Sequence, residues 1–317
     1  MKTASTSAVR VIHSGLLTTV QDLGRWGFAA MGVPVAGAMD VRSHRLANLI
    51  VGNDPSVATL EVTLIGPRLE FEDERVVAVA GAEFELALEG RRVPMYERLS
   101  VSRGSQLAFG ARRRGARAYV AISGGIDVEP VLGSRSTHVA SAMGGVSGRA
   151  LRAGDRFPLG SSSGARQPDH WPTIEVPNGY AEVRIVPGPQ EDHFASDALD
   201  ILQGAPYRVG HASDRIGFRL EGRPLGHSRA AEIISDATIS GTLQVPGSGL
   251  PILLTADRQT TGGYPKLATV ISADMGLVGQ LAPGDTIGFR LCSIREALNA
   301  LIVQERAFVS LEQVERA

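Results

Sequence analysis

Short apolar runs separated by turn-forming residues recur along most of the chain, which predicts a protein built mainly from β-strands. Val, Ile, Leu and Phe gather in these runs, and Gly, Asp, Arg and Pro stand between them. Strands this short and closely spaced are typical of a closed or nearly closed β-architecture and not of alternating β–α–β units. In the N-terminal half the predicted strands are residues 9–13, 60–66, 68–71, 75–81, 83–90, 106–111 and 117–125.

Hairpin turns are predicted where charged residues and a glycine separate two of these strands. The clearest are residues 89–91, with the sequence Glu-Gly-Arg, and residues 112–115, with the sequence Arg-Arg-Arg-Gly. Glycine can supply the positive φ that a tight hairpin turn requires. We therefore expect the chain to reverse direction at both places.

Two amphipathic helices are predicted among the strands. The first follows Asp40, carries an apolar stripe at Leu46, Leu49 and Ile50, and ends at Gly52. The second lies near the C-terminus and begins with a capping box, in which Ser and Glu three residues apart satisfy free backbone N–H groups. Its capping and apolar residues are Ser293, Ile294, Glu296, Ala297, Leu298, Leu301 and Ile302.

A glycine-rich stretch at residues 18–40 is predicted to be a long ordered loop. Long ordered loops in compact domains often carry function, although this one could equally cover one end of a barrel. Its candidate contact residues are Asp22, Arg25, Trp26 and Asp40.

Residues 160–179 are rich in Ser, Gly and Pro, which is typical of a boundary between domains. We therefore predict an N-terminal β-rich region at residues 1–160, with the glycine-rich loop and one helix. A C-terminal β-barrel region is predicted at residues 180–317, with a Gly-Gly-Tyr-Pro-Lys loop and a terminal helix.

The most chemically diverse loop lies at residues 257–266, between apolar runs at 250–255 and 267–272. It places a carboxylate, an amide, hydroxyls, a phenol and an ammonium group within ten residues. Its two adjacent glycines allow a ligand to approach the main chain closely. The loop predicts catalytic roles for Asp257 and Lys266. It predicts substrate-binding roles for Gln259, Thr260, Gly262, Gly263 and Tyr264.

Lys266 is unusual because only two of the 32 lysine and arginine residues are lysines, and the other is Lys2. A compact ammonium acts as a point charge on a phosphate or carboxyl group, which the planar guanidinium does less readily. The alternative is a surface lysine without a role. We expect the Lys266 ammonium to face a cleft, where Asp257 would orient it or act as a general base.

Two further polar strand ends, at residues 188–192 and 213–217, are also candidate parts of the site. Arg215 offers a bidentate donor for a carboxylate or phosphate, with Asp214 next to it as a second substrate-binding candidate. An internal Asp214–Arg215 ion pair that fixes a turn is the structural alternative. Asp40 is the remaining substrate-binding candidate, and His193 and His211 are the histidines of most interest.

Composition and charge exclude several classes of function. A formal net charge of −1 and the absence of a basic stripe argue against nucleic-acid binding. Neither a phosphate-binding loop nor a nucleophile-elbow motif is present, and neither the histidines nor the single cysteine has metal-site spacing. We expect no metal site. The lone Cys292, together with the absence of a membrane-length apolar run or a signal-peptide pattern, predicts a cytoplasmic protein.

Six long motifs stand out in this sequence: TVQDLGRWGFAAMGVPVAGAMD, LANLIVGN, LEVTLIGP, VPGPQEDHF, SDRIGFRL and QVPGSGLPILLTADRQTTGGYPKLATVISAD. They resemble the family of 5-oxoprolinase C subunits, also called allophanate hydrolase subunit 2 or biotin-dependent carboxyltransferase-like. The resemblance runs from about Val9 to about Phe289, and the same motifs are similar to part of the carboxyltransferase domain of urea carboxylase.

The resemblance implies a cyclophilin-like β-barrel architecture and one subunit of a hydrolase that acts on a cyclic amide. The reaction would be the ATP-dependent opening of 5-oxo-L-proline to L-glutamate. The partners would be a homologous 5-oxoprolinase B subunit and a third subunit, with ATP as cofactor.

Two alternatives follow from the same resemblance. One is a biotin-dependent carboxyltransferase, or urea amidolyase-related, subunit, for which biotin would arrive on another chain. The other is a non-enzymatic regulatory partner of a kinase inhibitor. Both enzymatic reactions develop negative charge on a carboxyl or carbonyl oxygen, which an ammonium and backbone N–H groups stabilise.

Overall fold

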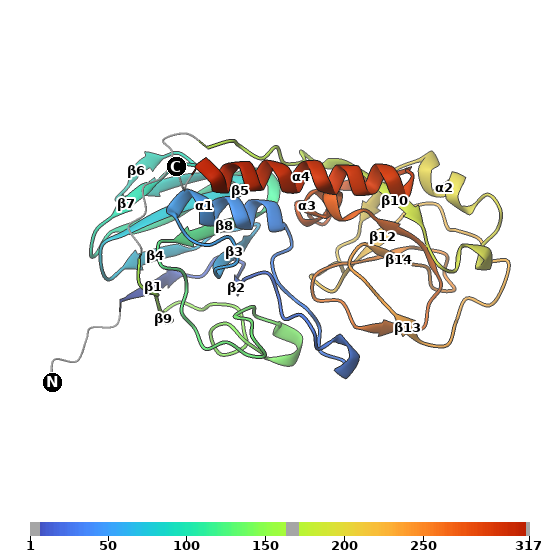
Figure 1. Ribbon diagram of the computed structural model, residues 1–317, viewed down its shortest axis with the longest axis horizontal. Coiled ribbons are helices and arrows are strands. Elements are labelled where there is room, and N and C mark those ends of the chain that lie inside the picture. The colour runs from blue at the N-terminus through green and yellow to red at the C-terminus, as the bar shows by residue number, and fades with distance from the viewer. Residues whose placement is uncertain (1–6, 163–170, 315–317) are drawn as a thin grey trace. The chain divides into compact units, whose positions relative to one another are not determined.

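The computed structural model describes residues 7–162 and 171–314, and Figure 1 shows their helices and strands. The chain divides into two compact units. Unit 1 comprises Met1–Arg25, Ala36–Val176 and Ser310–Ala317, and unit 2 comprises Trp26–Val35 and Pro177–Val309. The junction predicted at residues 160–179 lies partly outside the described residues, and the two separable regions stay a prediction.

Unit 1 is built on a 9-stranded sheet. Its apolar side chains form one core, in which Leu60, Val79 and Val120 are fully buried. The main strand order is β2 (Leu17–Gln21), β3 (Thr59–Thr63), β8 (Gln106–Ile122), β4 (Arg68–Phe71), β1 (Ala8–His13) and β9 (Arg156–Pro158). Strand β5 (Arg75–Leu88) pairs with β8 and also with β6 (Arg91–Val93) and β7 (Leu99–Val101).

The predicted turn at residues 112–115 is wrong, because β5 and β8 continue as long paired strands through this region. Register shifts between Gly81 and Leu86 absorb the irregularity. Such β-bulges bend a strand without ending it. The arginines that suggested a turn instead make cross-strand ion pairs, Arg113 with Glu85 and Arg114 with Glu83.

Helix α1 (Val41–Val51) lies against β5 and β8 in unit 1 (Figure 1). Asp40 is its N-cap and accepts hydrogen bonds from the backbone N–H of Ser43 (3.2 Å) and from its hydroxyl (2.6 Å). Gly52 ends the helix at a φ of 77°, in the left-handed region that favours glycine. The predicted helix and both of its boundaries are confirmed.

The glycine-rich stretch is only partly a loop. Residues 18–21 belong to β2, so the expectation of irregular structure is wrong there. Beyond the strand, Asp22 holds the loop to a second segment by accepting hydrogen bonds from the hydroxyls of Ser134 (2.7 Å) and Ser136 (2.5 Å). The short helix η1 (Ala29–Met31) lies within the glycine-rich stretch. The short helix η2 (Val139–Ser141) follows Ser136 in the second segment.

Unit 2 contains a closed β-barrel, which confirms the mainly β, barrel-based fold expected from the sequence. Its strands β10 and β18 run parallel, whereas the other neighbours are antiparallel. The strand order around the barrel is β10 (Tyr180–Pro187), β17 (Lys266–Val270), β14 (Thr242–Gln244), β15 (Ile252–Leu254), β12 (Gly217–Glu221), β11 (Tyr207–Val209) and β18 (Thr286–Leu291).

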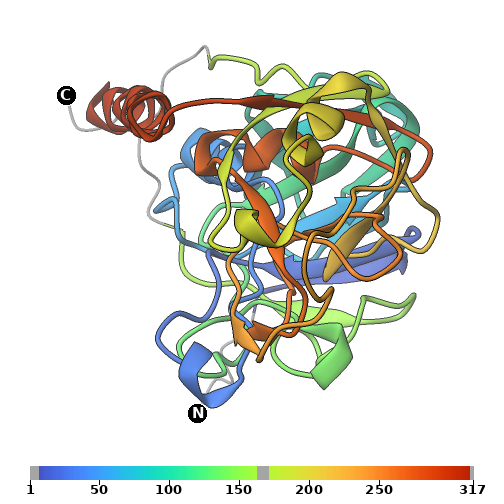
Figure 2. The same cartoon turned by 90° about the vertical axis from the view of Figure 1, so that its right-hand side faces the viewer.

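Two short strands of unit 2 stand outside the barrel. Strands β13 (Asp236–Ala237) and β16 (Thr261–Gly262) pair only with each other. They lie below the barrel strands in both Figure 1 and Figure 2. The helices of unit 2 are η1, η3 (Glu191–His193), α2 (Ala198–Gly204), η4 (Ser272–Asp274), α3 (Met275–Gly279) and most of α4 (Ile294–Val314).

The Ser293 half of the predicted C-terminal capping box is confirmed, whereas the Glu296 carboxylate accepts a hydrogen bond from Arg290. The Ser293 hydroxyl accepts the backbone N–H of Glu296 at 3.1 Å, at the start of α4. The apolar residues of this helix differ in burial. Ala297 packs near buried Cys292, whereas Ile294 and Leu298 are exposed. Within residues 7–162 and 171–314, no helix has the length and apolarity needed to cross a membrane.

Candidate functional site

The loop at residues 257–266 is held against a second segment of unit 2. Strand β16 in this loop pairs with β13, with Asp236 opposite Gly262. The ladder continues on both sides, because Ile233 donates its N–H to the Gly263 carbonyl (2.8 Å) and Thr238 donates to the Thr260 carbonyl (3.0 Å). The loop is therefore an ordered arm with its polar side chains in fixed places.

Lys266 begins β17, and its ammonium forms an ion pair with Asp236 (Nζ–Oδ2 2.7 Å). The lysine side chain is 4% exposed and the aspartate side chain is 51% exposed, so the pair reaches the surface through its acid. The hydrogen bond from Lys266 lowers the pKa of Asp236 below its ordinary value, so this carboxyl stays ionised at neutral pH. The surface-lysine alternative does not hold for this buried side chain.

Gln190 joins this pair from the polar strand end at residues 188–192. Its side-chain oxygen accepts the backbone N–H of Lys266 at 3.3 Å, and its amide nitrogen lies 3.5 Å from the Asp236 carboxylate. The sequence could not show whether residues 188–192 and the lysine loop converge, and in the structure Gln190 brings them together.

A second pair of amides lies beside the lysine. Gln244 stands opposite Lys266 in the β14–β17 register and is buried. Its oxygen accepts a hydrogen bond from Gln259 (3.2 Å), and its nitrogen donates to the Tyr264 carbonyl (3.4 Å). A Cβ on Gly262 would stand 2.4 Å from the Gln244 amide nitrogen, so glycine allows this approach.

Asp257 is engaged by Arg215 and not by Lys266. Its two carboxylate oxygens accept hydrogen bonds from Arg215, at 3.0 Å from Nε and 2.9 Å from Nη2, and both side chains are 6% exposed. The expectation that Asp257 orients the lysine is wrong, because Arg215 takes both of its oxygens at the base of the loop. A carboxylate engaged in this way is poorly placed to act as a general base.

Asp214 and Asp40 make structural contacts that do not involve the lysine. Asp214 accepts the N–H groups of Ile216 (2.8 Å) and Gly217 (3.2 Å), which fixes a turn, and so the proposed Asp214–Arg215 ion pair is replaced by Arg215–Asp257. Asp40 belongs to unit 1, where it caps α1.

The remaining candidates differ in exposure. Gln259 and Tyr264 are exposed, and Thr260 is half-buried. His193 lies in η3, with Nδ1 3.4 Å from the Ala230 carbonyl, and His211 is exposed. The structure gives neither histidine a place among the groups around Lys266.

Three residues near Lys266 were not assigned from the sequence: Asp236, Gln190 and Gln244. Gln190 carried a weak signal as part of a polar strand end. Asp236 and Gln244 stand in ordinary strand-like surroundings, and only the pairing of β13 with β16 and β14 with β17 brings them to Lys266. We call Gln190, Asp236, Gln244, Gln259 and Lys266 the lysine cluster.

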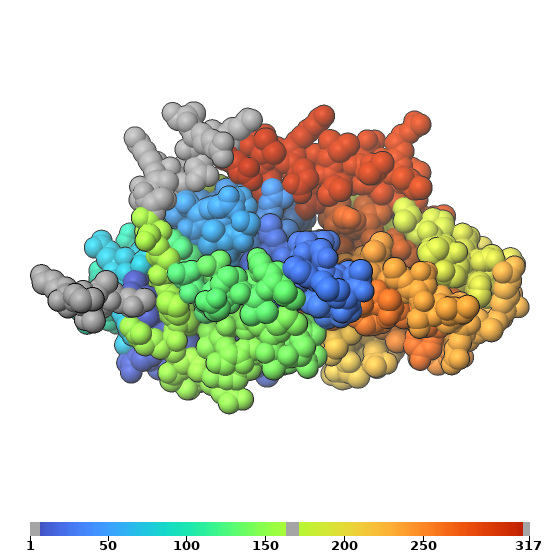
Figure 3. Space-filling view, turned by 60° about the horizontal axis from the view of Figure 1, so that its bottom comes forward, coloured from blue at the N-terminus to red at the C-terminus, as the bar shows by residue number. Residues whose placement is uncertain are grey.

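Exposed apolar side chains accompany the lysine cluster in unit 2. Figure 1, Figure 2 and Figure 3 place η1, in dark blue, beside the β13–β16 arm in orange. Trp26 is 70% exposed and Met31 is 69% exposed on this segment, and Ile234 is 95% exposed on the arm. Exposed large apolar groups around polar residues are typical of a ligand or protein interface.

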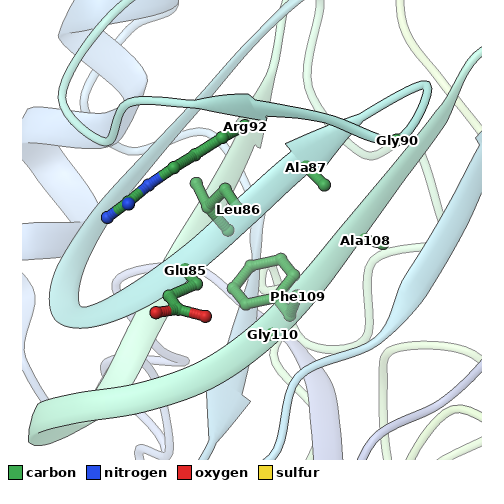
Figure 4. Close-up of a pocket in the computed structure, with 8 residues that line it drawn as sticks. All are labelled: Glu85, Leu86, Ala87, Gly90, Arg92, Ala108, Phe109 and Gly110. Carbon is green, nitrogen blue, oxygen red and sulfur yellow. The ribbon is translucent and has the colours of Figure 1, made fainter.

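Two hollows elsewhere do not form a comparable site. Figure 4 shows one of about 300 Å³ in unit 1, where the Arg92 side chain and the Glu85 carboxylate extend away from the Phe109 ring. The other, of about 610 Å³ in unit 2, reaches Leu267. This hollow is lined by residues other than those of the lysine cluster. Within the described residues, no three His, Cys, Asp or Glu side chains form a metal-binding group.

Comparison with known proteins gives this architecture a family. The carboxyltransferase domain family, subdomain A and B, matches residues 31–291. The chain belongs to this family. The C subunit of a 5-oxoprolinase from Escherichia coli is 39% identical over 303 residues, which cover 96% of this chain and 97% of that protein.

Members of the carboxyltransferase domain family also occur inside much longer proteins. The urea amidolyase of Saccharomyces cerevisiae is 33% identical across 96% of this chain, which spans only 18% of that protein. The crystal structure of the K. lactis urea amidolyase superposes with a TM-score of 0.89 at 33% identity, and this chain covers 20% of it. The shared part is therefore one section of those proteins.

Proposed function

We propose that this chain is the C subunit of an ATP-dependent 5-oxoprolinase, which opens 5-oxo-L-proline to L-glutamate. The observation that carries the proposal is the 39% identity to the E. coli 5-oxoprolinase chain over nearly the full length of both proteins. A second relative with the same name, from Haemophilus influenzae, is 34% identical across 94% of both chains.

Lys266 is the proposed catalytic residue. Water attack on the ring amide develops negative charge on its carbonyl oxygen, and a fixed ammonium stabilises that charge. An ammonium has three N–H donors, of which Asp236 engages one at 2.7 Å. In this proposal the substrate carbonyl takes another, while Asp236 and Gln190 hold the ammonium in place.

The other predicted site residues have supporting roles in this proposal. The exposed amide of Gln259 and the Thr260 hydroxyl bind the polar edge of the substrate, and Tyr264 covers it. Gly262 and Gly263 keep the main chain accessible. The buried Arg215–Asp257 pair fixes the base of the loop, so we assign Asp257 a positioning role in place of the catalytic one expected from the sequence.

ATP does not fit this chain through a phosphate-binding loop, because the sequence has none. Biotin does not fit as an attached group either, because the one internal lysine is buried in an ion pair. Under this proposal ATP binds to a companion chain, and no step on this chain uses it.

The proposed partners are a homologous 5-oxoprolinase B subunit and a third subunit, assembled in the cytoplasm. The E. coli relative is named as one subunit of its enzyme, which supports the existence of other subunits. The exposed Trp26, Met31 and Ile234 give unit 2 an apolar surface that suits a protein partner.

A carboxyltransferase is the second candidate. It is supported by the name of the matching family and by the TM-score of 0.89 to a urea amidolyase. In that reaction the same ammonium would stabilise a carboxyl oxygen, and biotin would come from another chain.

A reconstitution assay separates the two candidates. The purified chain is combined with its companion subunits and given either 5-oxo-L-proline with ATP or urea with carboxybiotin. We expect glutamate to form in the first mixture. Carboxylation of urea without any glutamate would favour the carboxyltransferase, and no turnover in either would favour a regulatory role.

A further inference from the structure

Arg258 is the second residue of the candidate loop at residues 257–266, and sequence patterns did not single it out. It stands between Asp257 of the buried ion pair and Gln259 of the lysine cluster. Its side chain is half-buried, and its Nε atom is inaccessible to water and has no hydrogen-bond partner. Because the residue is only half-buried, part of it remains exposed to solvent.

Other enclosed arginines of unit 2 have an acidic partner. Arg215 pairs with Asp257 at 2.9 Å, and Arg184 pairs with Asp274 at 2.6 Å. Among residues 7–162 and 171–314, no carboxylate forms an ion pair with Arg258, and burial lowers its pKa from the ordinary value. Removing an ion from water without compensation is unfavourable, so a missing anion would complete this arrangement.

The backbone around Arg258 is fixed on both sides. Asp257 donates its N–H to the Arg215 carbonyl at 2.8 Å, and Arg258 donates to the Thr255 carbonyl at 3.3 Å. On the other side, the Gln259 carbonyl accepts the Thr238 hydroxyl. A segment anchored in this way holds the backbone of Arg258 in one place, which suits a recognition residue.

We infer that Arg258 is the residue that binds the carboxylate of the substrate. This inference rests on the proposed function, because 5-oxo-L-proline carries a carboxylate next to its ring amide. The planar guanidinium can donate two parallel hydrogen bonds to such a group. Lys266 would then act on the amide and Arg258 on the carboxylate, so that Arg258 selects acidic cyclic amides over neutral ones.

The test compares 5-oxo-L-proline with 2-pyrrolidinone, the same ring without the carboxylate. Equilibrium binding of both compounds is measured on the reconstituted complex, together with KM and kcat for 5-oxo-L-proline. Arg258→Gln should weaken binding of 5-oxo-L-proline by about 10- to 100-fold and leave 2-pyrrolidinone unchanged. Arg258→Lys should recover part of that loss. Most of the effect should fall on KM, because the carboxylate keeps its charge throughout the reaction.

Arg219→Gln is the matched control, because Arg219 is an exposed arginine of the same barrel without an acidic partner among the described residues. It should bind both compounds like the wild type. The melting temperature of Arg258→Gln should not fall, since no ion pair is lost; a fall together with equal weakening toward both compounds would indicate a structural arginine and overturn the inference.

The inference and the proposed function fail separately. Glutamate formation with an unchanged KM in Arg258→Gln overturns the inference and leaves the function standing. Carboxylate-selective binding that depends on Arg258, without glutamate formation, overturns the function and supports the inference. If the wild-type complex binds neither compound, both are overturned.

Discussion

The carboxylate of Asp22 in unit 1 and the ammonium of Lys266 in unit 2 are both withdrawn from water, but their surroundings differ. Asp22 accepts hydrogen bonds from two hydroxyls and from the N–H groups of Gly24 (2.8 Å) and Arg135 (2.6 Å). Burial alone would raise its pKa, and these bonds outweigh burial and lower it. The Asp22 carboxylate therefore has a structural role, which is to hold two segments together.

Lys266 has a different environment, because its ion pair with Asp236 ends in an exposed carboxylate. Polar amides surround it, and Arg258, whose Nε has no hydrogen-bond partner, lies on the same loop. The comparison teaches that burial of a charge does not by itself mark a site. A site is marked by hydrogen-bond donors that remain available to a ligand. Of the two buried charges, Lys266 is the one with such donors nearby.

Removing the Asp22 carboxylate should have the largest effect on stability. Asp22→Ala leaves several donors without an acceptor, so the free energy of unfolding should fall by about 3 to 5 kcal/mol. Urea denaturation measures this change, with the exposed Glu74→Ala as control. A fall of less than about 1 kcal/mol would show that Asp22 is not a structural group.

His44 should make unit 1 sensitive to acid. Burial lowers its pKa from 6.5 to about 4, against the opposing charges of Asp22 and Glu61. Between these values the unfolded chain binds a proton that the folded chain does not, so stability falls as pH falls through this window. The loss should reach roughly 3 kcal/mol near pH 4. His44→Gln should remove this slope from urea denaturation measured at several pH values; an unchanged slope contradicts the assignment.

Breaking the ion pair of the lysine cluster should affect activity more than folding. Asp236→Asn keeps the shape of the side chain but loses the charge that holds Lys266, so kcat should fall by about 10-fold. Because the pKa of Asp236 is lowered, the pair weakens only as pH falls through that lowered value. Wild-type turnover between about pH 6 and 8 should therefore not titrate with Asp236. Normal turnover in Asp236→Asn would remove this residue from the site.

We expect the smallest effect from cutting the chain between its two predicted regions, residues 1–160 and 180–317. Limited proteolysis should first cut within residues 160–179, where the sequence is rich in Ser, Gly and Pro. Mass spectrometry of the early fragments identifies the cut. A first cut within residues 60–124 would show that the predicted boundary is wrong.

The sequence predicted those features that depend on neighbouring residues. Asp40, Ser43 and Gly52 specify α1 because caps act within one helical turn, and Ser293 and Glu296 do the same for α4. The rarity of lysine in the sequence makes Lys266 a candidate site residue without any knowledge of its partner.

Features that depend on distant pairing could not be predicted. The continuation of β8 through residues 112–115 needs the register shifts of its partner β5. The partner of Lys266 is 30 residues away in sequence and meets it only through the β13–β16 arm. The preference of Asp257 for Arg215, 42 residues away, has the same cause.

The most direct test of the account is the turnover of Lys266 variants in the reconstituted complex. Lys266→Ala should lower kcat for 5-oxo-L-proline by about 100-fold or more while the chain still folds, because the developing oxyanion loses its ammonium. Lys266→Arg should recover only part of this loss, since the guanidinium differs in shape and hydration. Near-normal turnover in both variants would contradict the claim that the lysine cluster is the functional site.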